Sequence, residues 1–348
     1  MPALQRLHRP TLTIAIPCYN SADYMDHCIE SLLTGAKDVE IIIVDDGSTK
    51  DCTPEKADEW ARRHPDTIKV IHQPNKGHGG AVNAGLDAAT GHYFRVVDSD
   101  DWLDKDALGL LLTKLRGFVA SANPADLVVT NYVYEHVATG NRRAIRYRGP
   151  LPTNKQITWD HTRLFGVGQN ILMHAATYRT QVLRDAGLKL PEHTFYVDNI
   201  FVYVPLPLVK TLYYLPVDLY HYFIGRDDQS VNEPIMVSRL DQQMRITAIM
   251  VEAHKLPEGI PDRKLARYME NYLALIVAAS SIFSVIKGGE EGLAMRRAMW
   301  EHIDSVDPDL RARLGRHAVV LGTNLAGPYG RRLSLFGYRL AQNLFHFN

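Results

Sequence analysis

The stretch HYFRVVDSDDWLD (residues 92–104) decides how the rest of the sequence is interpreted. Its apolar first half ends abruptly in Asp98, Ser99, Asp100 and Asp101, so three carboxylates fall within four positions and repel one another. A buried strand that delivers acids in this way is typical of the carboxyl edge of a parallel sheet, where open α/β folds bind ligands. Magnesium-like ions take one or two carboxylates together with substrate phosphates. The stretch therefore predicts a site for a divalent cation that carries a diphosphate.

The first half of the chain alternates strand and helix patterns. Apolar strand-like runs occupy 12–16, 39–44, 68–72, 92–97 and 126–131, and helical patterns fall between them at 24–33, 55–63, 80–89 and 105–115. Continuous apolar strands separated by helices indicate a parallel sheet covered on both faces. Right-handed crossovers then give a doubly wound α/β architecture, Rossmann-like and mainly parallel.

The alternation ends near residue 140, and after Pro234 the pattern becomes helical. Helices are expected over 237–255, 263–286 and 292–306, with a shorter helical stretch over 199–209. We therefore expect an α/β domain over 1–235, divided into a nucleotide-binding half at 11–131 and an acceptor half at 132–235. A helical C-terminal region over 236–348 follows it.

Composition narrows the class of protein but names no partner. Of the 348 residues 46% are hydrophobic and 22% are charged, as in ordinary soluble globular proteins, and the formal net charge of zero gives no reason to expect nucleic acid. Cys18, Cys28 and Cys52 are odd in number and lack metal-ligand spacing, which fits a reduced cytoplasmic chain. The N-terminus shows no signal peptide. The longest apolar run, at 272–286, is shorter than the roughly 20 residues of a membrane span, so we expect a core helix there.

The last part of the chain, 329–348, has the pattern of a basic amphipathic helix. No acidic residue follows Asp309, and the apolar residues at helical spacing are Tyr329, Leu333, Phe336, Leu340, Leu344 and Phe347. Such a helix lies on an anionic membrane surface or docks on its own domain, and both interpretations stay open. The predicted location is therefore cytoplasmic, or peripheral at the inner face of the membrane.

Three more polar stretches follow predicted strands at the same edge. They are IPCYN (16–20), VDDGSTKDCTP (44–54) and NKGHGGAVNAGLDAATG (75–91). Asp45 or Asp46 could accept hydrogen bonds from the base or ribose of a nucleoside. The glycines of the third stretch permit close backbone approach to a ligand, and Lys76 adds a positive charge near a helix start. Singly each stretch is an ordinary turn or cap; four in this order are not.

Together these stretches resemble the family-two inverting glycosyltransferases of GT-A fold. The resemblance covers roughly residues 11–231. It implies a nucleotide-sugar donor, with uridine as the usual base, and a Mn²⁺ or Mg²⁺ ion. The implied donor-binding residues are Pro17, Tyr19, Asn20, Asp45, Asp46, Lys76, Gly77, Gly80, Asn83, Asp98 and Ser99. Within this set Asp46 resembles the base-binding acid. Asp98 and Asp100 match the metal motif, with Asp98 toward the ribose or the water shell of the ion.

The family places a general base at a helix start after the metal motif, often written Glu-Asp. Asp198, in HTFYVDNIFVYVPL, is the candidate here, and Val197 stands where the glutamate is usual. Burial would raise the pKa of Asp198 and helix-start donors would lower it. A plain helix N-cap is the alternative role.

A late loop, LYHYFIGRDDQSVN (219–232), adds two candidates. Arg226 resembles a residue that closes over the diphosphate in relatives, where an arginine makes bidentate phosphate contacts. His221 is a further candidate metal ligand, with a packed core histidine as the alternative.

The resemblance thus implies metal-dependent transfer of a single sugar to a glycan or lipid-linked acceptor, in cell-envelope or exopolysaccharide synthesis. A catalytically silent relative that binds nucleotide-sugar or glycan is the alternative. A dinucleotide enzyme is disfavoured because the first strand end, IPCYNSADY, lacks G-x-G-x-x-G. The motifs leave the sugar and the acceptor open.

Overall fold

A computed structural model describes residues 9–33, 38–136, 140–166, 169–224 and 232–345. The chain forms two compact units, Met1–Gly225 and Arg226–Asn348. The predicted boundary at residue 235 falls inside helix α7 (Glu233–Ser238), which belongs to the second unit. The two units divide ten residues before the predicted boundary, and the predicted domains with their roles stay predictions.

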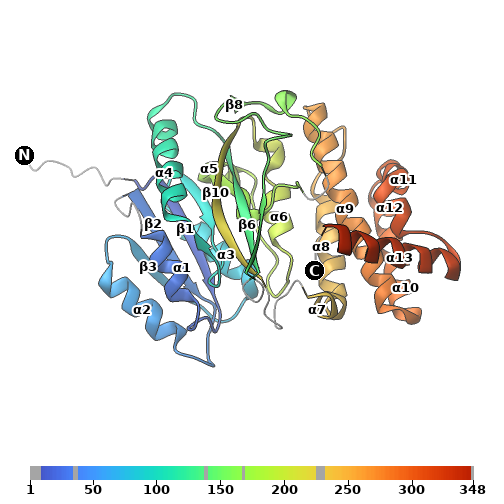
Figure 1. Cartoon of the computed structure of the whole chain (residues 1–348), viewed down its shortest axis with the longest axis horizontal. Coiled ribbons are helices and arrows are strands. Elements are labelled where there is room, and N and C mark those ends of the chain that lie inside the picture. The colour runs from blue at the N-terminus through green and yellow to red at the C-terminus, as the bar shows by residue number, and fades with distance from the viewer. Residues whose placement is uncertain (1–8, 34–37, 137–139, 167–168, 225–231, 346–348) are drawn as a thin grey trace, which may run out of the picture. The chain divides into compact units, whose positions relative to one another are not determined.

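The first unit is built on a ten-stranded mixed sheet of order β3-β2-β1-β4-β9-β6-β10-β5 (Figure 1). The strands are β1 Leu12–Cys18, β2 Val39–Asp45, β3 Ile68–His72, β4 Tyr93–Val96, β5 Trp102–Leu103, β6 Leu127–His136, β7 Asn141–Ile145, β8 Gln156–Ile157, β9 Ala176–Arg179 and β10 Leu212–Ile224. β7 pairs with β6 and β8 pairs with β10, outside the main path. All five predicted strands are present.

The N-terminal half of the sheet is parallel. β1 pairs in parallel with β2 on one side and with β4 on the other, and β2 pairs in parallel with β3. Every residue of β1 and β2 is buried, which explains their continuous apolar sequences. Because the chain order reverses between β2 and β4, β1 lies at the switch point where such sheets bind ligands.

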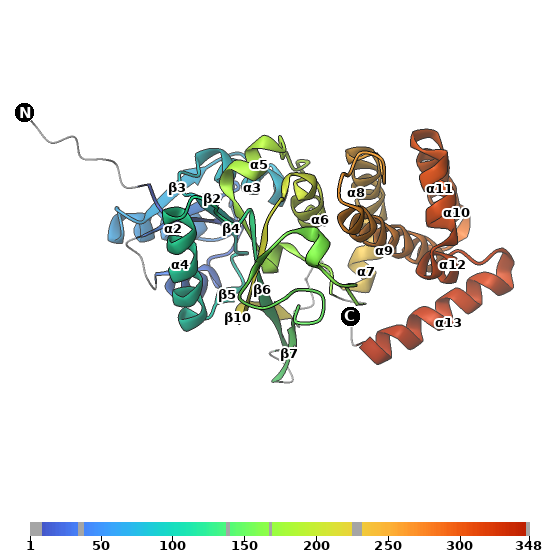
Figure 2. The ribbon, with the colours of Figure 1, turned by 90° about the horizontal axis from the view of Figure 1, so that it is seen from above.

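Helices connect these strands and cover both faces of the sheet (Figure 2). They are α1 Met25–Leu32, α2 Thr53–Arg63, α3 Gly77–Ala88 and α4 Lys105–Ala120. Asp104 caps α4 by accepting a hydrogen bond from the Ala107 amide at 2.8 Å. The four predicted helices are thus present, with ends displaced by a few residues.

The second half of the sheet is mixed. β9 inserts between β4 and β6 and is antiparallel to both, whereas β6 and the long β10 pair in parallel. The register of β10 shifts between Leu215 and Tyr220, a bulge in its middle. The short elements here are the 3₁₀ helices Trp159–His161, Met173–Ala175 and Leu206–Leu208, with α5 Thr180–Asp185 and α6 Asp198–Tyr203. α6 covers only the start of the helix predicted over 199–209, because Pro205 and Pro207 follow it.

The second unit is helical throughout its described residues. After α7 it contains α8 Leu240–Ala253, α9 Arg263–Lys287, α10 Gly289–Val306, α11 Pro308–Arg316, α12 Ala318–Thr323 and α13 Gly327–Phe345. α9 is 25 residues long and is the one helix in the described residues long and apolar enough to cross a membrane; 72% of its apolar window is buried. The helix predicted over 263–286 is therefore present and ends one residue later, at Lys287.

Candidate active site

The acids of residues 98–101 lie just beyond the carboxyl end of β4, next to the end of β1. The Ser99 hydroxyl donates to the Ser21 hydroxyl at 2.8 Å, so the turn after β4 is joined to the turn after β1. The Asp101 amide donates to the Asp98 carbonyl at 3.0 Å and closes the turn itself. Local hydrogen bonds thus hold the predicted acid cluster at the switch point of the sheet.

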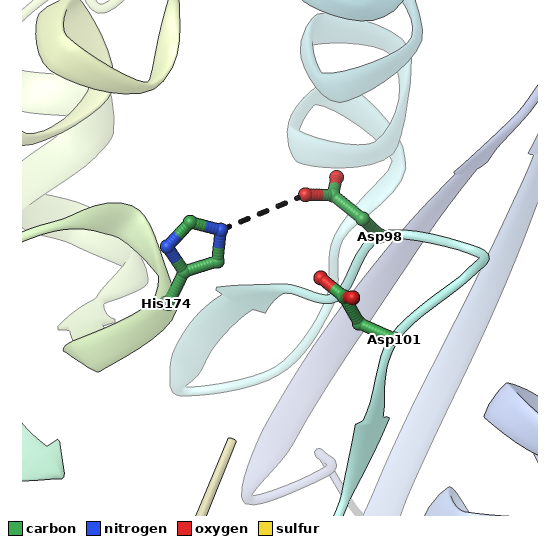
Figure 3. Close-up of side chains that lie close together, drawn as sticks. All are labelled: Asp98, Asp101 and His174. Carbon is green, nitrogen blue, oxygen red and sulfur yellow. Dashed lines mark ion pairs between the residues drawn. The ribbon is translucent and has the colours of Figure 1, made fainter. Parts of the chain in front are cut away.

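Asp98 is the centre of this cluster. Its Oδ1 lies 2.7 Å from Nε2 of His78, in the first turn of α3, and its Oδ2 lies 3.9 Å from Nε2 of His174 (Figure 3). Burial alone would raise the pKa of Asp98, but the charge and hydrogen bond of His78 outweigh it and the pKa lies below its ordinary value. Burial would likewise lower the pKa of His78, and Asp98 raises it. The two side chains therefore form an ion pair.

Asp101 behaves in the opposite way. It is fully buried, and burial together with the charges of Asp100 and Asp98 raises its pKa well above the ordinary value. The Tyr220 hydroxyl donates to its Oδ2 at 2.5 Å, and the Phe223 amide donates to its Oδ1 at 2.8 Å. Asp101 is therefore held by the end of β10, which closes this side of the site.

His174 reaches Asp98 from a separate part of the chain, the 3₁₀ helix Met173–Ala175. Its ring stacks on Tyr222 with centroids 4.8 Å apart and meets Tyr220 edge-on at 4.7 Å. Burial lowers the pKa of His174 to about 4, so the ring is neutral at neutral pH. Its Nδ1 is buried and has no hydrogen-bond partner within the residues described.

A buried arginine supports this histidine. Arg95, on β4, is fully buried and donates from Nη1 to the Thr177 hydroxyl at 2.8 Å and from Nη2 to the carbonyl of His174. Its guanidinium lies 5.7 Å from the ring centre of Tyr220. Arg95 thus links β4 to the backbone that presents His174.

Asp198 begins α6, and its pKa responds to the same residues. Burial raises the pKa of Asp198 to about 6; the charge of His78 lowers it and the charge of Asp98 raises it. These mutual influences mean that Asp198 lies within electrostatic range of the His78–Asp98 pair. Its predicted position at a helix start is confirmed, since α6 begins at this residue.

The loop before α6 is packed directly on the start of α3. The His193 amide donates to the Lys76 carbonyl at 2.8 Å, and Asn83 bonds both the amide and the carbonyl of Leu190. Gly77, at φ +73°, leaves room for this loop, because a Cβ there would lie 2.9 Å from the His193 nitrogen. The glycine-rich stretch therefore positions the segment that carries Asp198, a task that its sequence did not reveal.

The acids after β2 are held by their own surroundings. Oδ1 of Asp46 accepts from Nε2 of Gln73 at 2.6 Å and from the Lys76 amide at 2.9 Å. Oδ1 of Asp45 accepts from the Ser48 amide at 3.1 Å, and its Oδ2 lies 2.9 Å from Nδ1 of His72. Both acids are nearly fully buried. They hold the turn after β2 against the strand and helix that follow.

The other predicted donor residues surround the same edge. Pro17 is buried in β1, while the Tyr19 side chain is 49% exposed beyond its end. Asn20, at φ 50°, accepts from the amides of Thr49 and Lys50 and so joins the turns after β1 and β2. Lys76 lies 3.5 Å from Glu192. A Cβ on Gly80 would meet the Lys76 side chain at 2.3 Å.

The two late-loop candidates have different outcomes. Arg226 lies outside the described residues. His221 lies 2.7 Å from Oε1 of Glu135 through Nδ1, and its ring stacks on Trp102 at 5.4 Å. Its neighbour Tyr220 bonds Asp101, and successive strand side chains point to opposite faces of a sheet. The structure therefore does not bring His221 to Asp98 and brings His174 there instead.

Comparison with known proteins identifies a family for the part of the chain that carries the site. The family model described as Glycosyl transferase family 2 matches residues 13–180, which carry the four predicted motifs. Residues 13–180 belong to glycosyltransferase family 2. A similar relative is the putative glycosyltransferase EpsH of Bacillus subtilis, 29% identical over 264 residues, which are 72% of either chain. The chondroitin synthase of Escherichia coli is 34% identical over 161 residues, 45% of this chain and 22% of that longer protein.

Solved structures agree on the fold. Residues 1–349 of S. aureus TarS, in complex with UDP-GlcNAc, superpose with a TM-score of 0.64 at 18% identity over 96% of this chain and 91% of that one. The mannosyltransferase PcManGT from Pyrobaculum calidifontis, in complex with GDP-Man and Mn²⁺, gives a TM-score of 0.53 at 17% identity over 91% and 86%. The predicted GT-A fold, followed by a helical region, is confirmed.

The side chains of this family 2 enzyme fit a metal ion. One ligand atom from each of Asp98, Asp101 and His174 lies within 4.8 Å of the others. Carboxylate and imidazole ligands together suit a divalent metal ion, and the buried surroundings leave the imidazole neutral, as a ligand must be. Asp98 and His174 are the better donors, because both oxygens of Asp101 already accept hydrogen bonds. Asp100 stays a predicted ligand.

Sequence reasoning missed His78 and His174. His78 stands inside the glycine-rich motif, in NKGHGG, so its place in the first turn of α3 was available as a signal. His174 gave no signal of this kind. It follows the apolar run ILM and reaches Asp98 only through the mixed pairing of β9.

Proposed function

We propose that this chain is an inverting glycosyltransferase that moves one sugar from a nucleotide-sugar, UDP-linked, to a glycan or lipid-linked acceptor in cell-envelope or exopolysaccharide synthesis. The observation that carries the proposal is Asp198 at the start of α6, with a pKa of about 6 and within electrostatic range of the His78–Asp98 pair. A base of that pKa is ionised at neutral pH and still takes up a proton readily. The relatedness to EpsH and the fold of TarS with UDP-GlcNAc support the substrate class.

In the proposed reaction, some residues act on the acceptor and others hold the donor. Asp198 accepts the proton of the acceptor hydroxyl, whose oxygen forms a bond to the anomeric carbon of the sugar. The bond from that carbon to the diphosphate breaks on the opposite face, and the nucleoside diphosphate leaves with the electron pair. A single displacement of this kind inverts the anomeric centre.

The donor side is assigned to residues 11–131 and the acceptor side to 132–235. In this proposal Asp45 or Asp46 receives the nucleoside, and the start of α3, with Lys76 and its amides, receives the diphosphate. Asp98, Asp100 and His174 would hold Mn²⁺ or Mg²⁺, which when bound offsets the charge that develops on the leaving diphosphate. The reaction would take place in the cytoplasm or at the inner face of the membrane.

The first test is donor hydrolysis by the purified protein with a panel of UDP- and GDP-sugars, with Mn²⁺ and with a chelator. We expect release of nucleoside diphosphate from at least one donor, and loss of that release on chelation. Release that the chelator does not change would refute the metal dependence. Donor binding by calorimetry without any release, with or without glycan acceptors, would instead identify the catalytically silent relative, which Val197 in place of the usual glutamate leaves as the second candidate.

A further inference from the structure

The last helix of the second unit, α13, has two apolar faces. One of them is docked. Leu335 and Tyr338 pack against the core cluster that contains Phe283, and the rings of Phe283 and Tyr338 are 6.3 Å apart. Ser334, on the same side, is 3% exposed. This face accounts for the attachment of α13 to its own unit.

The opposite face is uncovered. Tyr329, Leu333, Phe336 and Leu340 are 84%, 60%, 67% and 50% exposed, and their spacing of four, three and four residues aligns them along one side of the helix. We call these four residues the outer stripe. Figure 2 shows the length of α13 at one side of the second unit. A row of large apolar side chains of this kind is unusual on a free surface and marks an interaction site.

Basic side chains accompany the outer stripe. Arg332 and Arg339 are seven residues apart and lie along one edge of it. Arg339 is paired with Glu233 at 2.7 Å, whereas Arg332 forms no ion pair with any described acid. No acidic residue occurs after Asp309 in the sequence, so α13 itself contributes only positive charge. Arg332 is therefore the positive charge that stays available at the edge of the outer stripe.

We propose that the outer stripe, with Arg332 at its edge, docks on a bilayer that contains anionic phospholipids. The four apolar side chains enter the boundary between headgroups and acyl chains, and Arg332 meets lipid phosphates. A second copy of the chain is a poorer occupant. Two outer stripes packed together would bring the Arg332 side chains of both copies near an apolar interface, and α13 has no acidic residue to oppose them.

This inference extends the proposed function, because an enzyme with a lipid-linked acceptor must work at a membrane surface. Under this proposal the two interpretations of the basic tail apply to opposite faces of one helix, a docked face and a lipid-facing face. Leu344 and Phe347, which belong to the predicted amphipathic pattern, lie outside the described side chains and carry no part of the argument.

The test is flotation of the full chain with phosphatidylcholine vesicles that contain or lack phosphatidylglycerol. We expect binding to the anionic vesicles only. Leu333→Ser with Phe336→Ser should weaken that binding about tenfold or more, because both side chains lose their apolar burial. Arg332→Gln should weaken it about fivefold and remove part of its salt dependence.

Matched controls come from the first unit. Leu110→Ser with Leu164→Ser changes two side chains that are 55% and 68% exposed, and Lys105→Gln removes an exposed cation; none should alter vesicle binding. Thermal unfolding checks that the variants are folded, and the conservative Arg332→Gln tests the proposal even if the double serine variant is not. Donor hydrolysis, measured in parallel, separates a failure of this proposal from a failure of the proposed function.

Wild-type protein that does not float with anionic vesicles would overturn the proposal. So would equal binding by wild type and the outer-stripe variants. If the wild type instead sediments as a dimer that Leu333→Ser with Phe336→Ser dissociates, without effect on vesicles, the outer stripe is an interface between copies and the lipid proposal is wrong.

Discussion

Two pairs of acids end two strands on either side of β1, and the structure treats them differently. Asp45 and Asp46, after β2, accept hydrogen bonds from the turn and helix start that follow them. Asp98 and Asp101, after β4, face each other's charge, and their pKa values move in opposite directions. The first pair is satisfied by neutral donors and one histidine. The second pair requires protons, histidines or a cation to offset its charge.

The motifs VDDGS and VDSDD are thus similar in sequence but have different surroundings at the same edge of the sheet. A pair held by amides fixes a loop and, in the proposed reaction, would present a constant surface to the nucleoside. A crowded pair responds to any change in charge nearby, which suits a site where a diphosphate arrives and leaves. Asp198 belongs with the second pair, since its pKa depends on both His78 and Asp98.

The largest effect expected is on catalysis. Asp198→Asn should lower kcat about 10²–10⁴-fold, because the acceptor hydroxyl loses its base, while donor affinity is kept. Asp46→Asn should do the reverse and weaken donor binding about tenfold with a much smaller change in kcat. Steady-state kinetics with the donor identified by hydrolysis, and calorimetry for donor affinity, separate the two.

The pH profile provides the control for this prediction. In the wild type, kcat/KM for the donor should fall as the pH drops below about 6, because protonated Asp198 is no longer a base. Full transfer activity in Asp198→Asn would mean that the base lies elsewhere, and an equal loss of kcat in both variants would erase the distinction between the two pairs.

A smaller effect is expected on stability. Tyr220→Phe removes the hydroxyl that donates to the fully buried Asp101, so the free energy of unfolding should fall by about 1–3 kcal/mol in urea denaturation without metal. Tyr329→Phe, at a position 84% exposed, is the control and should change nothing measurable.

Asp101→Asn tests whether the effect on stability comes from the protonation state of Asp101. The pKa of Asp101 is higher in the folded protein than in the unfolded chain, so the wild type loses stability as pH rises from the unfolded pKa through the folded one. The neutral amide lacks this loss, and the stability gap between the variant and the wild type should therefore close or reverse as pH rises. A gap independent of pH would show that Asp101 is charged in the folded state.

Much of the first unit follows from sequence because its signals are local. The buried strands β1 and β2 consist of continuous apolar runs, and the acids after β4 end such a run abruptly. Residues on the acceptor side arrive by long-range pairing instead. His174 reaches Asp98 because β9 inserts antiparallel between β4 and β6, and no local pattern encodes that insertion.

His221 and the helix over 199–209 illustrate the same limit. A histidine between aromatic residues is compatible with a metal site or with packing, and the register of β10 against β5 places it beside Trp102. The helix predicted over 199–209 ends at Tyr203, because prolines follow this residue. The spacing of apolar and acidic residues predicted where strands and helices lie. Which face of the sheet each side chain occupies depended on pairing between strands that are distant in the sequence.

The smallest expected effect concerns the pair after β2. The hydrogen bond to Asp45 raises the pKa of His72 above its ordinary value of 6.5, with a second contact to Asp58 at 3.2 Å. A histidine with a raised pKa contributes stability that is fully present below the unfolded pKa and is lost as pH rises through the folded pKa. Because the His72 side chain is 43% exposed, we expect its interactions to contribute less than about 1 kcal/mol to the free energy of unfolding.

Urea denaturation tests this contribution. The free energy of unfolding of His72→Gln should be lower than that of the wild type at pH 5.5 and should match it at pH 8.5, two values that bracket about 6.5. Asp58→Asn should show a smaller difference of the same sign. A difference that persists at high pH would mean that His72 acts through packing, and that the acids after β2 are as insensitive to charge as their amide partners suggest.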